Sequence, residues 1–445
     1  MDFMKETDSP KIKDTIIQLL SNLANPKEIQ QYLDRFTAAG QTHFAVIKVG
    51  GAVLDKDLDN LCSSLAFLDR IGLFPIVVHG AGPQLTEHLN EQNISSEFID
   101  GQRVTSAPVL KTAKNIFVSQ NLVLANRLQN LGVKTSSITT GVFQAKPNEN
   151  GDLGYVGEVT DVTTGPIKLA IQSGAIPILS PLAETETGQT LNINADVATN
   201  QLAIALQPYK IIFLTETGGL LDKKGKVISS VNLATDFDEL MSKDWLHSGM
   251  KLKIKQINDI LKQLPSTASV SITKPLHLSK ELFTHKGSGT LIRMGESIIA
   301  HTNIDNVDCQ KIAELLETSF KKSLKDDYFD SLGECNIYIT QCYRAAAIVR
   351  SYKGMPYLDK FVVANEAKGE GLGKTLWQYV RDRHEKLFWR CKPHNNINGF
   401  YFTKADGCYK TKAWNFFWYG INDFTVIDQC FKYALEQPLT LKDNP

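Results

Sequence analysis

Several features that would assign a protein to a particular class are missing from this chain of 445 residues. Its seven cysteines form no CxxC pair and its nine histidines form no HExxH motif, so neither a disulfide framework nor a tightly held metal ion is expected. Lys+Arg and Asp+Glu both number 48, which leaves no positive excess for binding nucleic acid. No apolar run reaches membrane-spanning length, and the first residues resemble neither a signal nor a transit peptide. We therefore expect a cytoplasmic protein without nucleic-acid or membrane partners.

The segments that are present indicate three parts. Residues 10–40 carry the apolar periodicity of helices, which predicts a helical N-terminal arm over 1–40. From residue 43, apolar strands alternate with amphipathic helices, a pattern typical of a mostly parallel sheet covered by helices. The pattern ends near residue 301, and the polar stretch "TNIDNVDC" from Thr302 to Cys309 is interpreted as a linker. We predict an α/β domain over 41–301 and a smaller α/β domain within 302–445.

The second part contains a glycine-rich loop, "KGEGLGKTLW", at residues 368–377. A Walker A motif would need glycine at position 368, and a GxGxxG dinucleotide loop would need one at position 374; both positions are lysine. A strand, "YLDKFVVAN", leads into the loop, and a helix follows it directly. This order aims backbone N–H groups at one point, which is suited to phosphate.

The loop fits the pattern (R/Q/K)-x-x-G-x-G, and here the chain resembles the Gcn5-related N-acetyltransferase family, in which this loop grips the pyrophosphate of coenzyme A. The segment from Tyr343 to Ile421, with "LFWRCKPHNNINGFYF", resembles the acetyltransferase domain of N-acetylglutamate synthases. The resemblance implies acetyl-CoA and L-glutamate as substrates. It also implies these roles: Gly371, Gly373 and Lys374 hold the pyrophosphate, Lys360 and Arg390 bind the carboxylates of glutamate, Asn395 orients the substrate, and Tyr401 is the acid that protonates the departing thiolate.

Two positions in this domain leave alternatives open. A second arginine is usual two places after Arg390, but this chain has Lys392, which keeps the charge and loses the bidentate fork. Tyr401 lies in an aromatic run, so it could equally be an ordinary core residue.

Glycine turns also mark the first domain. In "IKVGG" Lys48 precedes Gly50 and Gly51, and "VVHGAG" places Gly80 and Gly82 at the end of the next strand. Together with "DGQRVT", "LNINAD" and "GMKLKI", these turns make residues 41–300 resemble N-acetylglutamate kinase of the amino-acid kinase family. The resemblance implies ATP with Mg²⁺ and N-acetylglutamate as substrates. It implies that Lys48 and Lys253 flank the transferred phosphoryl group, that Asp196 holds the lysines, that Arg103 and Asn192 bind the acetylglutamate carboxylate, and that Gly50, Gly51, Gly80 and Gly82 donate backbone hydrogen bonds to phosphates.

One departure bears on kinase turnover. The family commonly has three consecutive glycines after the histidine of the second strand, whereas this chain has Ala81 between Gly80 and Gly82. The added methyl group could crowd the phosphate or point away from it.

Three alternative functions therefore remain. The first is a bifunctional enzyme that acetylates glutamate and then phosphorylates the product, the two opening steps of the acetylated route to arginine. The second is a synthase whose kinase-like domain is a regulatory module, and the third is a non-enzymatic arginine sensor. Intact Lys48, Asp196 and Lys253 favour the first.

The resemblance further implies feedback inhibition by arginine and a homo-oligomer, either a tetramer or a hexamer. The inhibitor would bind in the kinase domain near "ELFTHKGSGTLIRMGE", where Glu281 and Glu296 could pair with the guanidinium and Gly287 and Gly289 could offer backbone groups to the α-carboxylate. An ordinary strand–turn–strand edge is the alternative interpretation.

Overall fold

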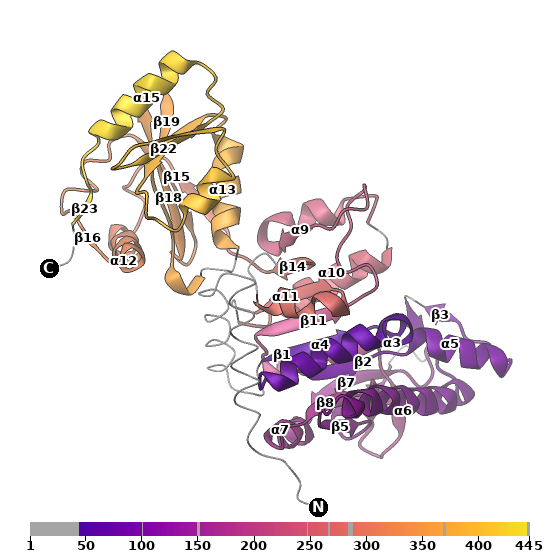
Figure 1. Ribbon diagram of the computed structural model, residues 1–445. Helices are drawn as coiled ribbons and strands as arrows, with labels where there is room; N and C mark the ends of the chain where they lie inside the picture. Colours follow the sequence, from indigo (N-terminus) through magenta and orange to yellow (C-terminus); the bar gives the residue numbers. More distant parts are fainter. Residues whose placement is uncertain are drawn as a thin grey trace, which may run out of the picture. The chain divides into compact units, whose positions relative to one another are not determined.

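The computed structural model describes residues 44–99, 101–148, 152–246, 248–265, 268–283, 288–367 and 371–442. The predicted helical arm over 1–40 lies outside these residues. The chain divides into two compact units, residues 1–294 and 295–445 (Figure 1). Within the described residues, no helix combines the length and apolarity needed to cross a membrane.

The first unit is built around an eight-stranded sheet of order β12-β14-β13-β11-β1-β2-β8-β5. Every neighbouring pair is parallel except β13 with β14. The strands are β1 (Ala45–Val49), β2 (Ile76–His79), β5 (Thr135–Ile138), β8 (Ile176–Leu179), β11 (Lys210–Leu214), β12 (Ser230–Asn232), β13 (Ser269–Thr273) and β14 (Thr290–Arg293). The predicted mostly parallel sheet is confirmed.

Helices cover both faces of this sheet because its strands are apolar on both sides. Ile47 and Val49 of β1 pack with residues of α4, α6 and α11, whereas Val46 packs with α7 and α8 on the opposite face. The helices are α3 (Gly51–Lys56), α4 (Leu58–Arg70), α5 (Gly82–Glu91), α6 (Ala107–Asn130), α7 (Gly165–Gln172), α8 (Ala195–Leu206), α9 (Leu233–Met241), α10 (Ser248–Leu261), the short η2 (Pro275–His277) and α11 (Leu278–Phe283).

Two small sheets of this unit were not expected from the sequence. One has the order β10-β9-β6-β7, with β6 (Phe143–Pro147), β7 (Gly157–Val162), β9 (Leu182–Glu184) and β10 (Thr190–Asn192). The other is the hairpin of β3 (Phe98–Ile99) and β4 (Gln102–Arg103). Their strands are either two or three residues long or rich in polar residues, as in "FQAKP" of β6 and "GEVTDV" of β7, so none forms an apolar run.

The second unit contains a seven-stranded sheet of order β15-β17-β18-β19-β20-β22-β21. It is antiparallel except where β19 pairs with β20, and α13 connects these two strands (Figure 1). The elements are β15 (Ile298–His301), α12 (Cys309–Phe320), β16 (Ser323–Leu324), β17 (Cys335–Thr340), β18 (Ala345–Tyr352), β19 (Met355–Val363), η3 (Asn365–Ala367), α13 (Leu372–Arg383), β20 (Leu387–Cys391), α14 (Asn398–Phe402), β21 (Gly407–Lys410), β22 (Asn415–Tyr419), α15 (Phe424–Glu436) and β23 (Leu441–Lys442).

The boundary between the units differs from the one expected at residue 301. β15 pairs with β17, so it is the edge strand of the second sheet and not the end of the first domain. The polar stretch after it is not a free linker, because Ile304 and Val307 pack against the core of the second unit.

Candidate active sites

The expected lysine–aspartate–lysine cluster of the first unit is present. Side chains alternate along β1, so Lys48 shares a face with Val46, which packs against α8. Asp196 lies in the first turn of α8, and its carboxylate is 2.7 Å from Lys48 Nζ and 3.1 Å from Lys253 Nζ of α10. Three side chains from distant segments thus place two ammonium groups around one carboxylate.

The two neighbouring lysines keep the Asp196 carboxylate ionised. Burial raises the pKa of Asp196, but the two lysine charges and their hydrogen bonds outweigh it and bring the value to about 2. Burial lowers the pKa of Lys253, the Asp196 charge opposes this shift, and Lys48 adds to it. Asp196 is therefore a fixed negative charge that holds both lysines.

The two glycine turns meet next to this cluster. A Cβ added at Gly80 would lie 3.5 Å from the Cβ of Ala195, at the start of α8, and 3.9 Å from the Gly51 amide nitrogen. A Cβ at Gly51 would lie 2.8 Å from Gln84 Oε1 and 3.0 Å from the Gly82 nitrogen, so this position needs glycine because the turns approach so closely. The N-terminus of α5, which begins at Gly82, has no side-chain cap, which leaves its first N–H groups available to a phosphate.

Ala81 does not crowd this region with its methyl group. The residue is 1% exposed and belongs to an apolar cluster with Leu85, Val109 and Phe117. The methyl therefore packs in the core under α5 and α6.

Arg103 and Asn192 are connected to the glycine turns through two threonines. Arg103 Nη2 donates to Thr86 Oγ1 at 2.6 Å, and the Thr86 hydroxyl donates to the Gly82 carbonyl at 2.9 Å. The Thr105 hydroxyl donates to the Arg103 carbonyl at 3.0 Å and accepts from Asn192 Nδ2 at 3.1 Å. The structure brings both predicted residues together. Thr86 was missed because a single threonine carries no motif, and Thr105, although it ends the motif "DGQRVT", was given no role.

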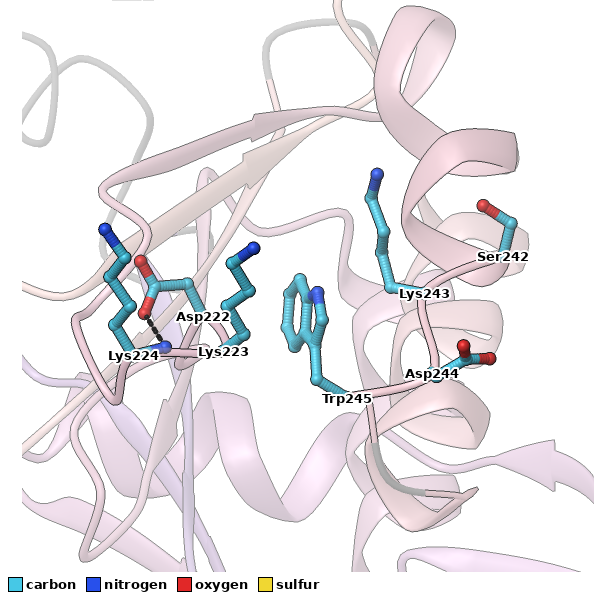
Figure 2. A pocket seen from close by; sticks show the side chains of 7 residues that line it. All are labelled: Asp222, Lys223, Lys224, Ser242, Lys243, Asp244 and Trp245. Carbon is cyan, nitrogen blue, oxygen red and sulfur yellow. Dashed lines mark hydrogen bonds between the residues drawn. The ribbon is translucent and has the colours of Figure 1, made fainter.

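A hollow of about 610 Å³ lies between the turn that follows β11 and the connection from α9 to α10 (Figure 2). Figure 2 shows the Trp245 ring between the side chains of Lys223 and Lys243. The Asp222 carboxylate accepts the Lys224 amide at 2.8 Å, which fixes the turn. The full lining is Asp222, Lys223, Lys224, Ser242, Lys243, Asp244 and Trp245.

In the second unit the glycine turn begins α13 at the carboxyl end of β19. Gly371 has φ 83°, a conformation that favours glycine, and no side chain caps the helix. A Cβ at Gly373 would lie 3.3 Å from Val363 Cγ2, so the helix starts close against β19. Lys374 is in the first turn of α13. The loop residues 368–370 lie outside the described part of the chain.

Tyr401 lies among aromatic rings on α14. Its ring centroid is 5.3 Å from that of Trp389 and 5.8 Å from that of Trp377, and the residue is 5% exposed. Burial, with a smaller contribution from Cys391, raises its pKa well above 10. The phenol is therefore protonated at neutral pH, as an acid must be. Its ring also belongs to the core, so the two interpretations of Tyr401 do not exclude each other.

The two asparagines beside Tyr401 have different roles in the local turn. Asn395 Oδ1 accepts the Ile397 amide at 3.2 Å, so the oxygen expected to orient substrate takes part in the turn itself. Asn398 Nδ2 donates to the carbonyls of Lys392 and Pro393 at 2.8 and 3.0 Å. These bonds fold the segment between β20 and α14.

The three cations expected to bind glutamate lie in different surroundings. Arg390 donates from Nη1 to the Ala434 carbonyl at 2.6 Å, and from Nη2 to the Pro438 carbonyl at 3.0 Å, at the C-terminal end of α15. Its guanidinium and Lys392 Nζ lie 4.1 and 3.9 Å from the centroid of the Trp414 ring. Lys360 Nζ is 2.7 Å from Asp359 Oδ2 in a buried pair.

Comparisons with known proteins agree with this geometry. Residues 43–273 match the model of the amino acid kinase family, which covers more than half of the chain. The chain belongs to the amino acid kinase family. Residues 299–437 match the model of the N-acetyltransferase of N-acetylglutamate synthase, so this amino acid kinase carries a second, acetyltransferase domain. The resemblance noted in the sequence is confirmed.

Relatives of this amino acid kinase span both domains. The acetylglutamate kinase of Xylella fastidiosa is 47% identical over 421 residues, which cover 95% of this chain and 100% of the relative. The mitochondrial N-acetylglutamate synthase of Homo sapiens is 34% identical over 410 residues, 90% of this chain and 74% of the relative.

Solved structures show the same fold. N-acetylglutamate synthase from Neisseria gonorrhoeae, complexed with coenzyme A and N-acetyl-glutamate, matches 86% of this chain and 92% of its own with 20% identity and a TM-score of 0.62. The same synthase complexed with coenzyme A and L-arginine matches 90% and 95%, with 18% identity and a TM-score of 0.58.

In this amino acid kinase, the residues expected to bind arginine have other partners. Glu281 Oε2 accepts the amides of Ser288 and Gly289 at 3.0 and 3.2 Å. Glu296 Oε1 pairs with Arg344 Nη1 at 2.9 Å, and both residues belong to the second unit. The assignment of these two glutamates to the binding of one guanidinium stays a prediction. Gly289 approaches the Ile272 carbonyl closely, and Gly287 lies outside the described residues.

Proposed function

We propose that this protein is a bifunctional enzyme that acetylates L-glutamate with acetyl-CoA and phosphorylates the γ-carboxylate of N-acetylglutamate with ATP. The observation that carries the proposal is the Lys48–Asp196–Lys253 cluster beside the glycine turns, in a chain that also holds an acetyltransferase domain. A kinase-like domain kept only for regulation has no need of this charged cluster. Together the two reactions open the acetylated route to arginine.

The first unit supplies what phosphoryl transfer to a carboxylate requires. The nucleophile is already anionic at neutral pH, so positioning and charge neutralisation replace a general base. Lys48 and Lys253 would lie on either side of the transferred group, and Asp196 would hold both of them in place. The N–H groups of Gly51 and Gly82 would bind phosphate oxygens, whereas those of Gly50 and Gly80 already donate to the carbonyls of Leu214 and Val49. Arg103 with Asn192 would bind the acetylglutamate.

The hollow beside Trp245 is suited to the nucleotide base. It opens next to the connection that leads into α10, the helix that carries Lys253. An adenine ring could stack on the indole while the neighbouring ammonium groups face the phosphates, and Mg²⁺ would arrive as part of the ATP complex.

The second unit supplies an acid and an anion site for acetyl transfer. The neutral amine of glutamate attacks the thioester carbonyl and the C–S bond breaks. Tyr401 would donate a proton to the departing thiolate, and the proton lost by the nitrogen would restore the phenol. The N-terminus of α13 would bind the pyrophosphate of coenzyme A through the N–H groups near Gly371 and Gly373.

The test is to incubate purified protein with glutamate and acetyl-CoA, with and without ATP and Mg²⁺, and to identify the products by mass. N-acetylglutamate without ATP, and its phosphate with ATP, would support both activities. N-acetylglutamate alone in both reactions would instead favour a synthase with a regulatory kinase-like domain.

Control by arginine is part of the same proposal. Suppose that arginine binds to the kinase domain and inhibits acetyl transfer by weakening the binding of coenzyme A to the other domain. The coupling must then be reciprocal: coenzyme A must weaken the binding of arginine by the same factor. Calorimetric titration with arginine, with and without coenzyme A, measures this factor. No binding heat at millimolar arginine, together with unaltered acetylation, would contradict feedback.

A further inference from the structure

Asp359 is the extra residue of a β-bulge next to the end of the β19–β20 pairing. In the ladder between β18 and β19, Ile348 is opposite Lys360 but Val349 is opposite Leu358, which leaves Asp359 without a partner residue. Consecutive side chains of a regular strand point to opposite faces, and a bulge changes this alternation. The Lys360 ammonium can therefore contact the carboxylate of the residue immediately before it.

Asp359 and Lys360 form a buried pair to which a third residue is added. Lys360 Nζ is 2.7 Å from Asp359 Oδ2, and their side chains are 8% and 6% exposed. The Tyr328 hydroxyl donates to the same oxygen at 2.7 Å, and Lys360 Nζ lies 4.7 Å from the centroid of the Tyr328 ring. One carboxylate oxygen thus fixes the lysine and the tyrosine together.

Lys360 keeps hydrogen-bonding capacity in this arrangement. An ammonium has three N–H groups. The acceptors for Lys360 Nζ within the described residues are Asp359 Oδ2 at 2.7 Å and the Asp359 carbonyl at 3.4 Å. At least one N–H therefore has no acceptor in the described part of the chain, and a buried donor in this state favours a ligand that accepts.

The position of Lys360 indicates which ligand. β19 and β20 pair only at Tyr357 with Phe388 and at Leu358 with Trp389, so Lys360 lies just past the last paired position. Arg390, one residue after Trp389, already donates to the carbonyls at the end of α15. Both cations are held in place and both keep donors, but Lys360 is buried and Arg390 is only half-buried, so a donor without an acceptor costs more at Lys360.

We propose that Asp359 and Tyr328 are positioning residues that hold the Lys360 ammonium as an anchor for one carboxylate of glutamate. The inference rests on the proposed acetylation of glutamate and adds two residues to it. Asp359 and Tyr328 do not touch the substrate; they act through Lys360.

The test uses Asp359→Asn, Tyr328→Phe, Lys360→Met and the double variant Asp359→Asn/Lys360→Met in the full-length protein, with acetylation measured in the absence of ATP. We expect Asp359→Asn to raise the KM for glutamate about tenfold or more, and Tyr328→Phe to raise it by a smaller factor, with the KM for acetyl-CoA unchanged in both. The KM for glutamate of the double variant should be no higher than that of Lys360→Met alone, because Asp359 acts only through the lysine. Tyr338→Phe is the matched control, because it removes another phenol hydroxyl of this unit, one that lies 2.7 Å from His384 Nε2.

The outcomes separate the inference from the proposed function. A parent enzyme that does not acetylate glutamate overturns both. If the parent is active, equal rises in both KM values, an unchanged KM for glutamate, or additive effects in the double variant would show a purely structural ion pair and overturn the inference alone. If Asp359→Asn fails to fold, Tyr328→Phe still tests the inference, because it keeps both charges of the Asp359–Lys360 pair. Its KM for glutamate is then the deciding measurement.

Discussion

At the scale of single residues, Tyr401 combines a core ring with a hydroxyl proton that it would donate. We predict that Tyr401→Phe lowers kcat of acetyl transfer by about 10²–10⁴-fold, the usual contribution of a general acid, while the KM for acetyl-CoA changes little. Release of coenzyme A thiol measures the rate. Tyr409→Phe, at an exposed position of β21, is the control. A parental rate in Tyr401→Phe would move the acid role to water or to another residue.

The pKa shifts of the kinase cluster lead to a prediction about alkaline pH. Burial lowers the pKa of Lys253 and Asp196 opposes this shift. Asp196→Asn removes the opposing charge, so Lys253 should lose its proton at still lower pH. In the pH profile of the phosphorylation activity that Asp196→Asn retains, we expect the fall on the alkaline side (the alkaline limb) to move down by about 1–3 pH units. This is the usual effect of a close opposite charge on a pKa.

The measurement is the pH dependence of kcat/KM, with each variant scaled to its own maximum. Asp59→Asn, which removes a carboxylate at the exposed contact with Arg127, should leave the limb in place. The parent should show no acid limb from Asp196 near neutrality, because the pKa of this residue is about 2. An unmoved alkaline limb in Asp196→Asn would mean that Lys253 does not determine it.

The sequence predicted the charged residues of the kinase cluster, and the structure brings Lys48, Asp196 and Lys253 together. Thr86, Thr105 and Tyr328 could not be predicted, since each acts through contacts between separate segments of the chain. Asp359 acts on the next residue and could not be predicted for another reason. For Asp359 the deciding fact is a one-residue change of strand register, and no local pattern of residue types shows it.

At the scale of elements, the contact between the two glycine turns determines the geometry of the phosphate site. We predict that Gly51→Ala destabilises the protein by about 1–3 kcal/mol, as overpacking does, and abolishes most phosphorylation. The added methyl would lie 2.8 Å from Pro83 Cδ and 3.0 Å from the Gly82 nitrogen, which forces α3 and α5 apart. Thermal unfolding and ATP-dependent product formation measure the two effects.

A matched control tests whether the crowding is responsible. Gly165, at the start of α7, has no atom within 4 Å of an added Cβ. Gly165→Ala should therefore keep the parental melting temperature and phosphorylation. If Gly51→Ala behaves like this control, the two turns do not depend on their close approach.

Prediction of elements succeeded where the strands are almost wholly apolar. The apolar runs that contain β1, β2, β8, β11 and β13 became neighbouring strands of one sheet. β15 was assigned to the wrong domain, because its sequence shows a strand but not its partner. That partner, β17, begins after α12, and pairing between such distant segments is a property of the folded sheet.

At the scale of the whole molecule, the two chemistries lie in separate compact units. We predict that Lys48→Ala abolishes ATP-dependent phosphorylation and retains most acetylation, because Lys48 belongs to the first unit and Tyr401 to the second. Both activities should be measured on one preparation whose folding is verified by circular dichroism. Loss of both activities in folded protein would indicate a shared or strongly coupled site.

The edge position of β15 determines where the coding sequence can be cut. A fragment that starts at residue 302 would lack β15 and expose β17, whose residues are mostly buried, as an open edge that invites aggregation. A fragment that starts at residue 295 keeps β15 paired with β17. Independent expression of the acetyltransferase, or its transplantation onto another kinase, therefore depends on a strand that its own amino-acid pattern assigns to the neighbouring domain.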